Sequence, residues 1–231
     1  TASAMKIAIS LLCACLPALA LAAPYTPKDG GAVIEQLPRR ADATQLELRA
    51  LRQQLNTTPQ DLALASGLAQ RYIGLARSET DPRYLGYAQA ALAPWWRQAA
   101  PPVPVRLLRA TILQSTHQFG PALQDLDAVI AQEPGNGQAW LTRATVLTVQ
   151  GDYAQATASC ARLSALTTQL VTVTCIANVA SVTGRAASSE RLLDLTLQRS
   201  AGAAPELESW ALTLLAEMAT RRGETALAEA R

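Results

Sequence analysis

The sequence predicts an all-α solenoid, a series of helical hairpins stacked one on the next. The first observation is a repeat, in which the residues that recur 34 positions later are Ala110 with Ala144, Leu113 with Leu147, Phe119 with Tyr153, Ala122 with Ala156, and Leu126 with Cys160. The second is composition, since alanine and leucine are abundant and aromatic residues make up only 4% of the chain. The third is a set of turn residues that divide each repeat into two segments of helical length. A fixed period near 34 residues is typical of stacked helix–turn–helix units.

The repeat continues further along the chain, at Ala177, Ala180 and Gly184 and then at Ala216, Ala219 and Gly223. These residues resemble the tetratricopeptide repeat (TPR) family, and the resemblance extends from about Val103 to Arg231. It implies a right-handed TPR-type solenoid, and the signal-peptide pattern described below, together with an arginine-rich and lysine-poor composition, indicates the exported bacterial type. Such arrays usually bind other chains and seldom catalyse reactions, so the resemblance implies a binding protein that is not an enzyme.

Apolar periodicity and turn residues give the expected order of elements. We expect upstream residues and a signal peptide at 1–22, an extended linker at 23–38, an N-terminal helix and a divergent first hairpin at 39–102, and a TPR array at 103–231. The expected helices are 42–55, 60–77, 82–99, 104–117, 120–132, 137–150, 152–166, 169–183, 186–200, 205–222 and 224 onward. Since the last repeat stops in its second helix, we expect the natural chain to continue beyond Arg231.

The first segment has the pattern of a secretory signal peptide. A single basic residue, Lys6, precedes an apolar run of about ten residues, and small residues follow it. A membrane-spanning helix needs about 20 apolar residues, so a retained anchor is disfavoured. We expect cleavage after Ala22 and export, with the periplasm as the destination. Lipid attachment at Cys15 is the competing hypothesis.

The charge balance excludes some partners. The formal net charge is +2, and removal of Lys6 leaves +1. Nucleic-acid binding usually needs a concentrated basic patch. Because the chain is nearly neutral, we expect it not to bind nucleic acid. We also expect no membrane span in the mature chain, and the partner to be a protein or a peptide. Self-association of the array stays open as an alternative.

The sequence offers few residues that could form a catalytic or metal-binding site. His117 is the only histidine, and it lies beside a turn. A nucleophile–histidine arrangement would have to use it, and metal sites usually combine several ligands at characteristic spacing. The sequence therefore predicts no catalytic residue, no cofactor and no metal.

The family resemblance implies a groove lined by one face of each repeat's first helix. Threonines, amides and few charges make up this face, which favours an extended peptide or a helix as the ligand. The alternative is that the face is simply solvated. The expected groove residues are Leu107, Thr111, Gln114, Gln138, Leu141, Thr145, Thr148, Thr174, Asn178, Ser181, Trp210, Thr213 and Glu217.

Two tryptophans and two cysteines carry further hypotheses. Trp95 and Trp96 either pack the first hairpin against the array or form an exposed anchor for a partner. Cys160 and Cys175 lie at matching heights on adjacent antiparallel helices, so a disulfide is possible outside a reducing compartment. Whether the two side chains face each other is not decided by the sequence.

The functional prediction is a non-catalytic scaffold that binds a peptide or a partner protein on the concave face of the solenoid. The alternative is the N-terminal TPR part of a larger enzyme, or of an envelope or secretion assembly protein, whose active domain lies beyond Arg231.

Overall fold

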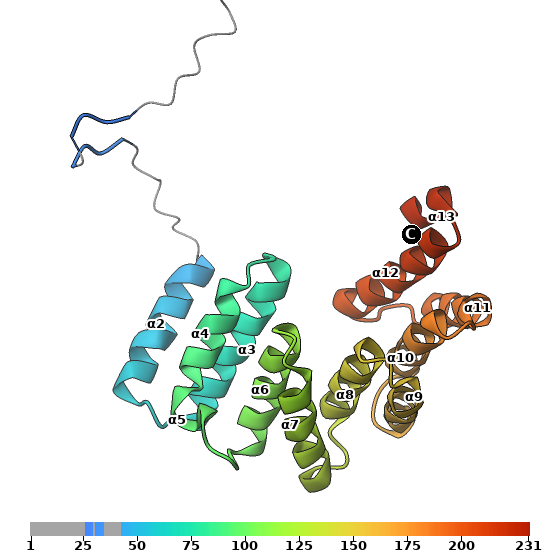
Figure 1. The fold of residues 1–231 in the computed structure, drawn as a ribbon, viewed down its shortest axis with the longest axis horizontal. Helices are drawn as coiled ribbons and strands as arrows, with labels where there is room; N and C mark the ends of the chain where they lie inside the picture. Colours follow the sequence, from blue (N-terminus) through green and yellow to red (C-terminus); the bar gives the residue numbers. More distant parts are fainter. Residues whose placement is uncertain (1–25, 30, 35–42) are drawn as a thin grey trace, which may run out of the picture. The chain divides into compact units, whose positions relative to one another are not determined.

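The computed structural model describes residues 26–29, 31–34 and 43–231 (Figure 1). The chain divides into two compact units, residues 1–45 and 46–231. The predicted leader at 1–22 lies outside the described residues, as does much of the predicted linker at 23–38. Every regular element in the described residues is a helix, and none of these helices is long and apolar enough to cross a membrane.

The helices follow the expected order closely. The hairpins succeed one another along the chain from α3 to α13 (Figure 1). Their bounds are α2 Ala43–Thr57, α3 Leu62–Ser78, α4 Arg83–Ala91, α5 Ala93–Trp96, α6 Val103–Ser115, α7 Phe119–Gln132, α8 Gly137–Val149, α9 Tyr153–Arg162, α10 Gln169–Val182, α11 Ala186–Gln198, α12 Pro205–Arg221 and α13 Thr225–Glu229.

Each hairpin pairs two successive helices, and neighbouring hairpins stack. The pairs are α3 with α4, α6 with α7, α8 with α9, α10 with α11, and α12 with α13. The first helices also contact one another in turn, α3 with α6, α6 with α8, α8 with α10, and α10 with α12. This arrangement confirms the predicted all-α class and the stacking of helical hairpins.

The predicted bounds of two helices differ from the structure. The helix predicted at 82–99 is split at Leu92 into α4 and α5. Pro94 explains the split, because its nitrogen carries no proton and cannot continue the hydrogen-bond ladder of α4. The helix predicted at 152–166 ends at Arg162, and a 3₁₀ turn at Leu163–Ala165 follows it.

Small residues form the seam of the hairpins, as the repeat predicts. Ala110 and Ala144 on first helices, and Ala122 and Ala156 on second helices, are at most 1% exposed. A methyl group at these positions lets the two helix backbones approach closely, and a larger side chain would force them apart. Ala177 is equally buried in the next repeat.

One backbone conformation closes the turn inside each hairpin of the array. His117, Gly151, Gly184 and Gly223 have φ of 60°, 81°, 82° and 77°, in the left-handed region. The next amide N–H then donates to a carbonyl five residues back, which is the bond that ends many helices. The four bonds are Gln118 N to Leu113 O at 2.8 Å, Asp152 N to Leu147 O at 2.9 Å, Arg185 N to Ala180 O at 3.1 Å, and Glu224 N to Ala219 O at 3.0 Å.

The divergent first hairpin shares a core with the array. Leu68 on α3 and Trp95 on α5 belong to one buried cluster with Val105 on α6. Residues 46–102 and 103–231 therefore lie within a single compact unit.

Candidate functional site

The predicted groove residues all lie on the first helices α6, α8, α10 and α12. Because these helices contact one another in succession, the set extends over four hairpins in series. The name predicted groove is kept for this set, Leu107, Thr111, Gln114, Gln138, Leu141, Thr145, Thr148, Thr174, Asn178, Ser181, Trp210, Thr213 and Glu217.

Three members of the set are not accessible to a partner. Thr174 is fully buried, and Thr111 and Ser181 are 7% and 8% exposed. The prediction that Thr174 lines the groove is therefore wrong. The reason is packing, since α10 contacts α8, α9, α11 and α12, and Thr174 lies inside these contacts. Gln138, Thr213 and Glu217 are exposed, and the remaining seven residues are partly exposed.

The threonine hydroxyls already donate a hydrogen bond to their own helix. Each bonds to the carbonyl four residues earlier, Thr145 to Leu141 at 3.1 Å, Thr148 to Ala144 at 2.7 Å and Thr213 to Ser209 at 2.8 Å. A hydroxyl has one proton to donate. These threonines therefore offer a partner their methyl groups and acceptor lone pairs rather than donors.

Amide side chains and one indole provide the remaining donors. Gln114, Asn178 and Trp210 are partly exposed, and within the described residues no hydrogen bond of their side chains is found. The side chain of Gln138 already makes one hydrogen bond, in which its Nε2 donates to Thr142 Oγ1 at 3.0 Å. The predicted groove thus combines methyl surface with a few widely spaced amide groups.

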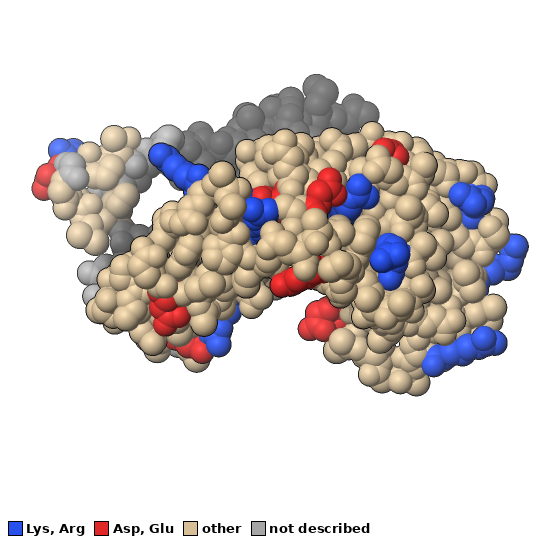
Figure 2. All heavy atoms as spheres, turned by 90° about the horizontal axis from the view of Figure 1, so that it is seen from below, with Lys and Arg blue, Asp and Glu red and all other residues tan. Residues whose placement is uncertain are grey.

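The charges near the predicted groove are already paired. Glu217 Oε2 lies 2.9 Å from Arg221 Nη2, and Arg221 Nη1 donates to Ser181 Oγ at 2.8 Å, which joins α12 to α10. Elsewhere, on the face drawn in Figure 2, charged side chains are scattered among uncharged ones and form no patch of one sign. This distribution of charges does not favour a partner that carries a strong net charge.

Comparison with known proteins supports the architecture. No family description matches the chain, and no curated protein matches it in sequence. Among solved structures it is similar to a tetratricopeptide repeat protein from Parabacteroides merdae, with a TM-score of 0.56 and 16% sequence identity over 79% of this chain and 68% of that one. The fold is TPR-like. At this identity the likeness shows the fold and carries no information on a specific partner.

The tryptophans of this TPR-like array mostly contribute to packing. Trp95 is 7% exposed and lies in the core between the first hairpin and α6, so it cannot serve as an exposed anchor. Trp96 and Trp210 are partly buried against core clusters. Trp140 donates from Nε1 to Pro134 O at 2.9 Å, and the Arg162 guanidinium lies 5.4 Å from its ring centroid.

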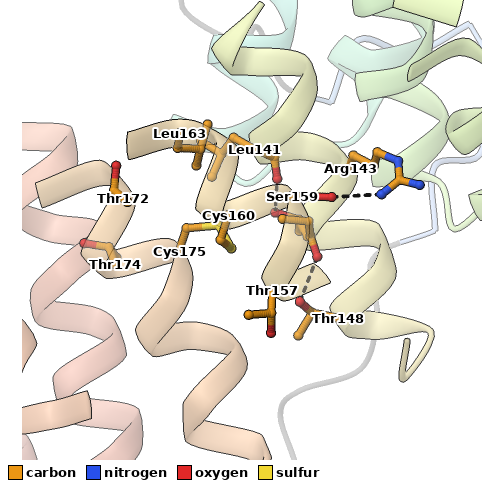
Figure 3. Close-up of a disulfide and its surroundings, with 12 residues drawn as sticks. Leu141, Arg143, Thr148, Thr157, Ser159, Cys160, Leu163, Thr172, Thr174 and Cys175 are labelled. Atoms are coloured by element: carbon orange, nitrogen blue, oxygen red, sulfur yellow. Dashed lines mark hydrogen bonds between the residues drawn. A yellow bond between two sulfur atoms is a disulfide. The ribbon is translucent and has the colours of Figure 1, made fainter. Parts of the chain in front are cut away.

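A disulfide joins Cys160 on α9 to Cys175 on α10 (Figure 3). The sulfur atoms are 2.01 Å apart and the Cα atoms 5.6 Å apart. Both cysteines are buried, in a cluster that also contains Leu163. The bond therefore ties the second helix of one hairpin to the first helix of the next, at the interface between repeats.

The single histidine has a structural explanation. His117 occupies the left-handed turn position that glycine takes in the next three hairpins, and its ring packs edge-on against Phe119 at 5.6 Å. Within residues 26–29, 31–34 and 43–231 no group of three or more His, Cys, Asp or Glu side chains is placed to hold a metal ion. The carboxylates of Asp125 and Asp127 pair with different arginines, Arg109 and Arg143.

Proposed function

We propose that the protein is a scaffold that binds an extended peptide or a helix of a partner protein along the predicted groove. The supporting observation is that Gln114, Asn178 and Trp210 are partly exposed and make no side-chain hydrogen bond within the described residues. They lie on three of the first helices that contact one another in series. TPR-like folds generally mediate protein–protein interaction, and the chemistry of the face decides the kind of ligand. Amide groups spaced along a methyl-rich surface suit the backbone of an extended chain.

We also propose that the protein acts outside the cytoplasm, in the periplasm of a bacterium. Two observations support this location. The segment before Ala23 has the pattern of a signal peptide, and Cys160 and Cys175 form a disulfide, a bond that persists in oxidising compartments. Expression in a Gram-negative host tests it, since the periplasmic protein should begin at Ala23. An intact N-terminus recovered from the cytoplasm would contradict export.

Site-specific photocrosslinking tests the binding face. A photoreactive residue is placed at Gln138, on the predicted groove, or at Gln124, an exposed position on the second helix α7. We expect one defined partner to be captured from the periplasm through position 138 and not through position 124. Equal capture at both positions, or none at 138, would contradict the proposed face.

The captured partner then allows an affinity measurement. Gln114→Ala and Asn178→Ala should each weaken binding by about 2–10-fold, the value of one neutral hydrogen bond. Gln124→Ala is the matched control and should leave the dissociation constant unchanged. If both groove variants bind as tightly as the unaltered protein, the amide side chains do not contact the partner.

A further inference from the structure

A small pocket lies apart from the predicted groove, between α2, α3 and α4. Its volume is about 160 Å³. Apolar side chains, among them Leu55 and Leu68, form part of its wall, and Arg52, Asn56 and Tyr72 add polar groups. No carboxylate is among the residues that line it.

Tyr72 contributes a hydroxyl group that has no partner. The residue is 2% exposed, and its hydroxyl oxygen is buried without a hydrogen bond. The neighbouring Tyr84, whose ring centroid is 6.1 Å away, has its hydroxyl donating to Glu79 at 3.1 Å. Burying a polar group without a partner costs free energy, so such groups are rare in native proteins and call for an explanation. Burial also raises the pKa of the Tyr72 phenol, which keeps it protonated and able to donate.

Arg52 brings a positive charge to the same pocket. It is exposed, its charge acts on the Tyr72 phenol, and its Nε makes only a long 3.4 Å bond to Leu48 O. Within the described residues it has no ion pair, whereas Arg71 pairs with Glu47 at 2.5 Å. An exposed and weakly held side chain can reorient towards a ligand in the pocket that it lines together with Tyr72.

We propose that this pocket binds a short aliphatic carboxylate, with Arg52, Tyr72 and Asn56 as its hydrogen-bond donors. A carboxylate only accepts hydrogen bonds, which matches the guanidinium, the phenol and the side-chain amide. The apolar side chains of the pocket wall contact the hydrocarbon part of the ligand. The volume is below the roughly 300–1,000 Å³ of pockets for drug-sized molecules, so the bound group has the size of one side chain. A free acid and the glutamate side chain of a partner protein share this chemistry.

Ligand titration followed by NMR or calorimetry tests the proposal on the full chain. Isovalerate is the free acid probe, and isovaleramide is its neutral control. The peptide probe is acetyl-Ala-Ala-Glu-Ala-Ala-amide, and its control carries glutamine in place of glutamate. We expect a dissociation constant on the order of 1 mM for at least one carboxylate, as befits so few atoms, and no saturable binding of its neutral control.

Three variants locate the site. Arg52→Gln and Tyr72→Phe should each weaken binding by about tenfold, as expected for a hydrogen bond to a charged group. Arg49→Gln removes a neighbouring arginine on α2 that does not line the pocket, and should change nothing. Tyr72→Phe should leave the unfolding midpoint unchanged or raise it, because the deleted hydroxyl makes no bond and its burial costs free energy.

Each outcome decides the proposal. Binding of isovalerate identifies a free acid as sufficient, and binding of the glutamate peptide alone identifies a protein ligand. Equal binding of acid and amide, binding that survives both Arg52→Gln and Tyr72→Phe, or no binding of either carboxylate overturns it.

Discussion

Arg109 on α6 and Asp125 on α7 form a two-pronged ion pair within the second hairpin. Nε lies 2.6 Å from Oδ2, and Nη2 lies 2.7 Å from Oδ1. Both side chains are at most 13% exposed. The remaining guanidinium nitrogen donates to Trp96 O at 2.6 Å and Gln98 O at 3.0 Å. One arginine therefore holds its own hairpin together and ties it to the loop of the hairpin before it.

The same contact recurs one repeat later in a weaker form. Arg143 and Ser159 stand 34 positions after Arg109 and Asp125, and Arg143 Nη1 donates to Ser159 Oγ at 2.8 Å. Serine lacks the charge of aspartate, and Arg143 bonds instead to Asp127 of the preceding hairpin at 2.7 Å (Figure 3 shows the contact with Ser159). The repeat thus keeps an arginine at the equivalent position, but the carboxylate that pairs with it comes from a different residue.

Removing one member of the first pair should be strongly destabilising. Asp125→Ala leaves a largely buried guanidinium without its counter-charge, which typically costs about 3–5 kcal/mol. Chemical denaturation of the two proteins measures the difference. Glu47→Ala is the control, because Glu47 and its partner Arg71 are 54% and 49% exposed and the loss of this pair should cost at most about 1 kcal/mol. Equal losses would show that burial of the pair does not determine its contribution.

The turn at His117 predicts a stabilising substitution. A side chain in the left-handed conformation costs about 1–2 kcal/mol, and glycine avoids this cost. His117→Gly should therefore raise the free energy of unfolding by about 0.5–1 kcal/mol, after allowance for the greater freedom of glycine in the unfolded chain.

Gly151→Ala is the matched test at the equivalent turn. No atom lies within 4 Å of an added Cβ there, so only the backbone conformation opposes the change. We expect a loss of about 1 kcal/mol in the same denaturation experiment. If His117→Gly is destabilising, the ring contact with Phe119 outweighs the backbone strain.

The sequence predicted the fold well because the repeat is carried by residues with one structural role. A small residue at Ala110, Ala144 or Ala177 marks the helix seam, and a glycine marks the turn, so the period fixes the phase of most helices. The prediction failed at the ends of two helices. Pro94 interrupts a helix that apolar periodicity alone extends, and Leu163 begins a 3₁₀ turn without a breaking residue before it.

The candidate sites were less predictable, because they depend on contacts between helices. The family resemblance places Thr174 in the groove, but the packing of four neighbouring helices around α10 buries it. The pocket beside Arg52 was missed altogether. Arg52 and Asn56 are four residues apart and share a face of α2, but nothing in the sequence shows that Tyr72 lines the same pocket or that its hydroxyl lacks a hydrogen-bond partner.

The small residues at the seam predict a further stability difference. Ala144→Leu and Ala177→Leu should each cost about 1–3 kcal/mol, because both positions are 1% exposed and cannot accept three more carbon atoms without strain. Thr145→Leu, at a partly exposed neighbouring position, should stay within about 0.5 kcal/mol. Thermal unfolding compares the three variants, and equal melting temperatures would contradict the assigned seam.

The last prediction concerns Cys160 and Cys175. In protein that begins at Ala23 and is recovered from the periplasm, a thiol reagent should find no free cysteine after denaturation. The bond closes a loop of 15 residues, which the chain-entropy description values at about 3 kcal/mol. Reduction should therefore lower the melting temperature. Cys160→Ser and Cys175→Ser should each reproduce that loss, and the double variant should be no less stable than either single one, because the bond is already absent in both. Two reactive thiols in the exported protein would instead leave the cysteines as small buried side chains between the repeats.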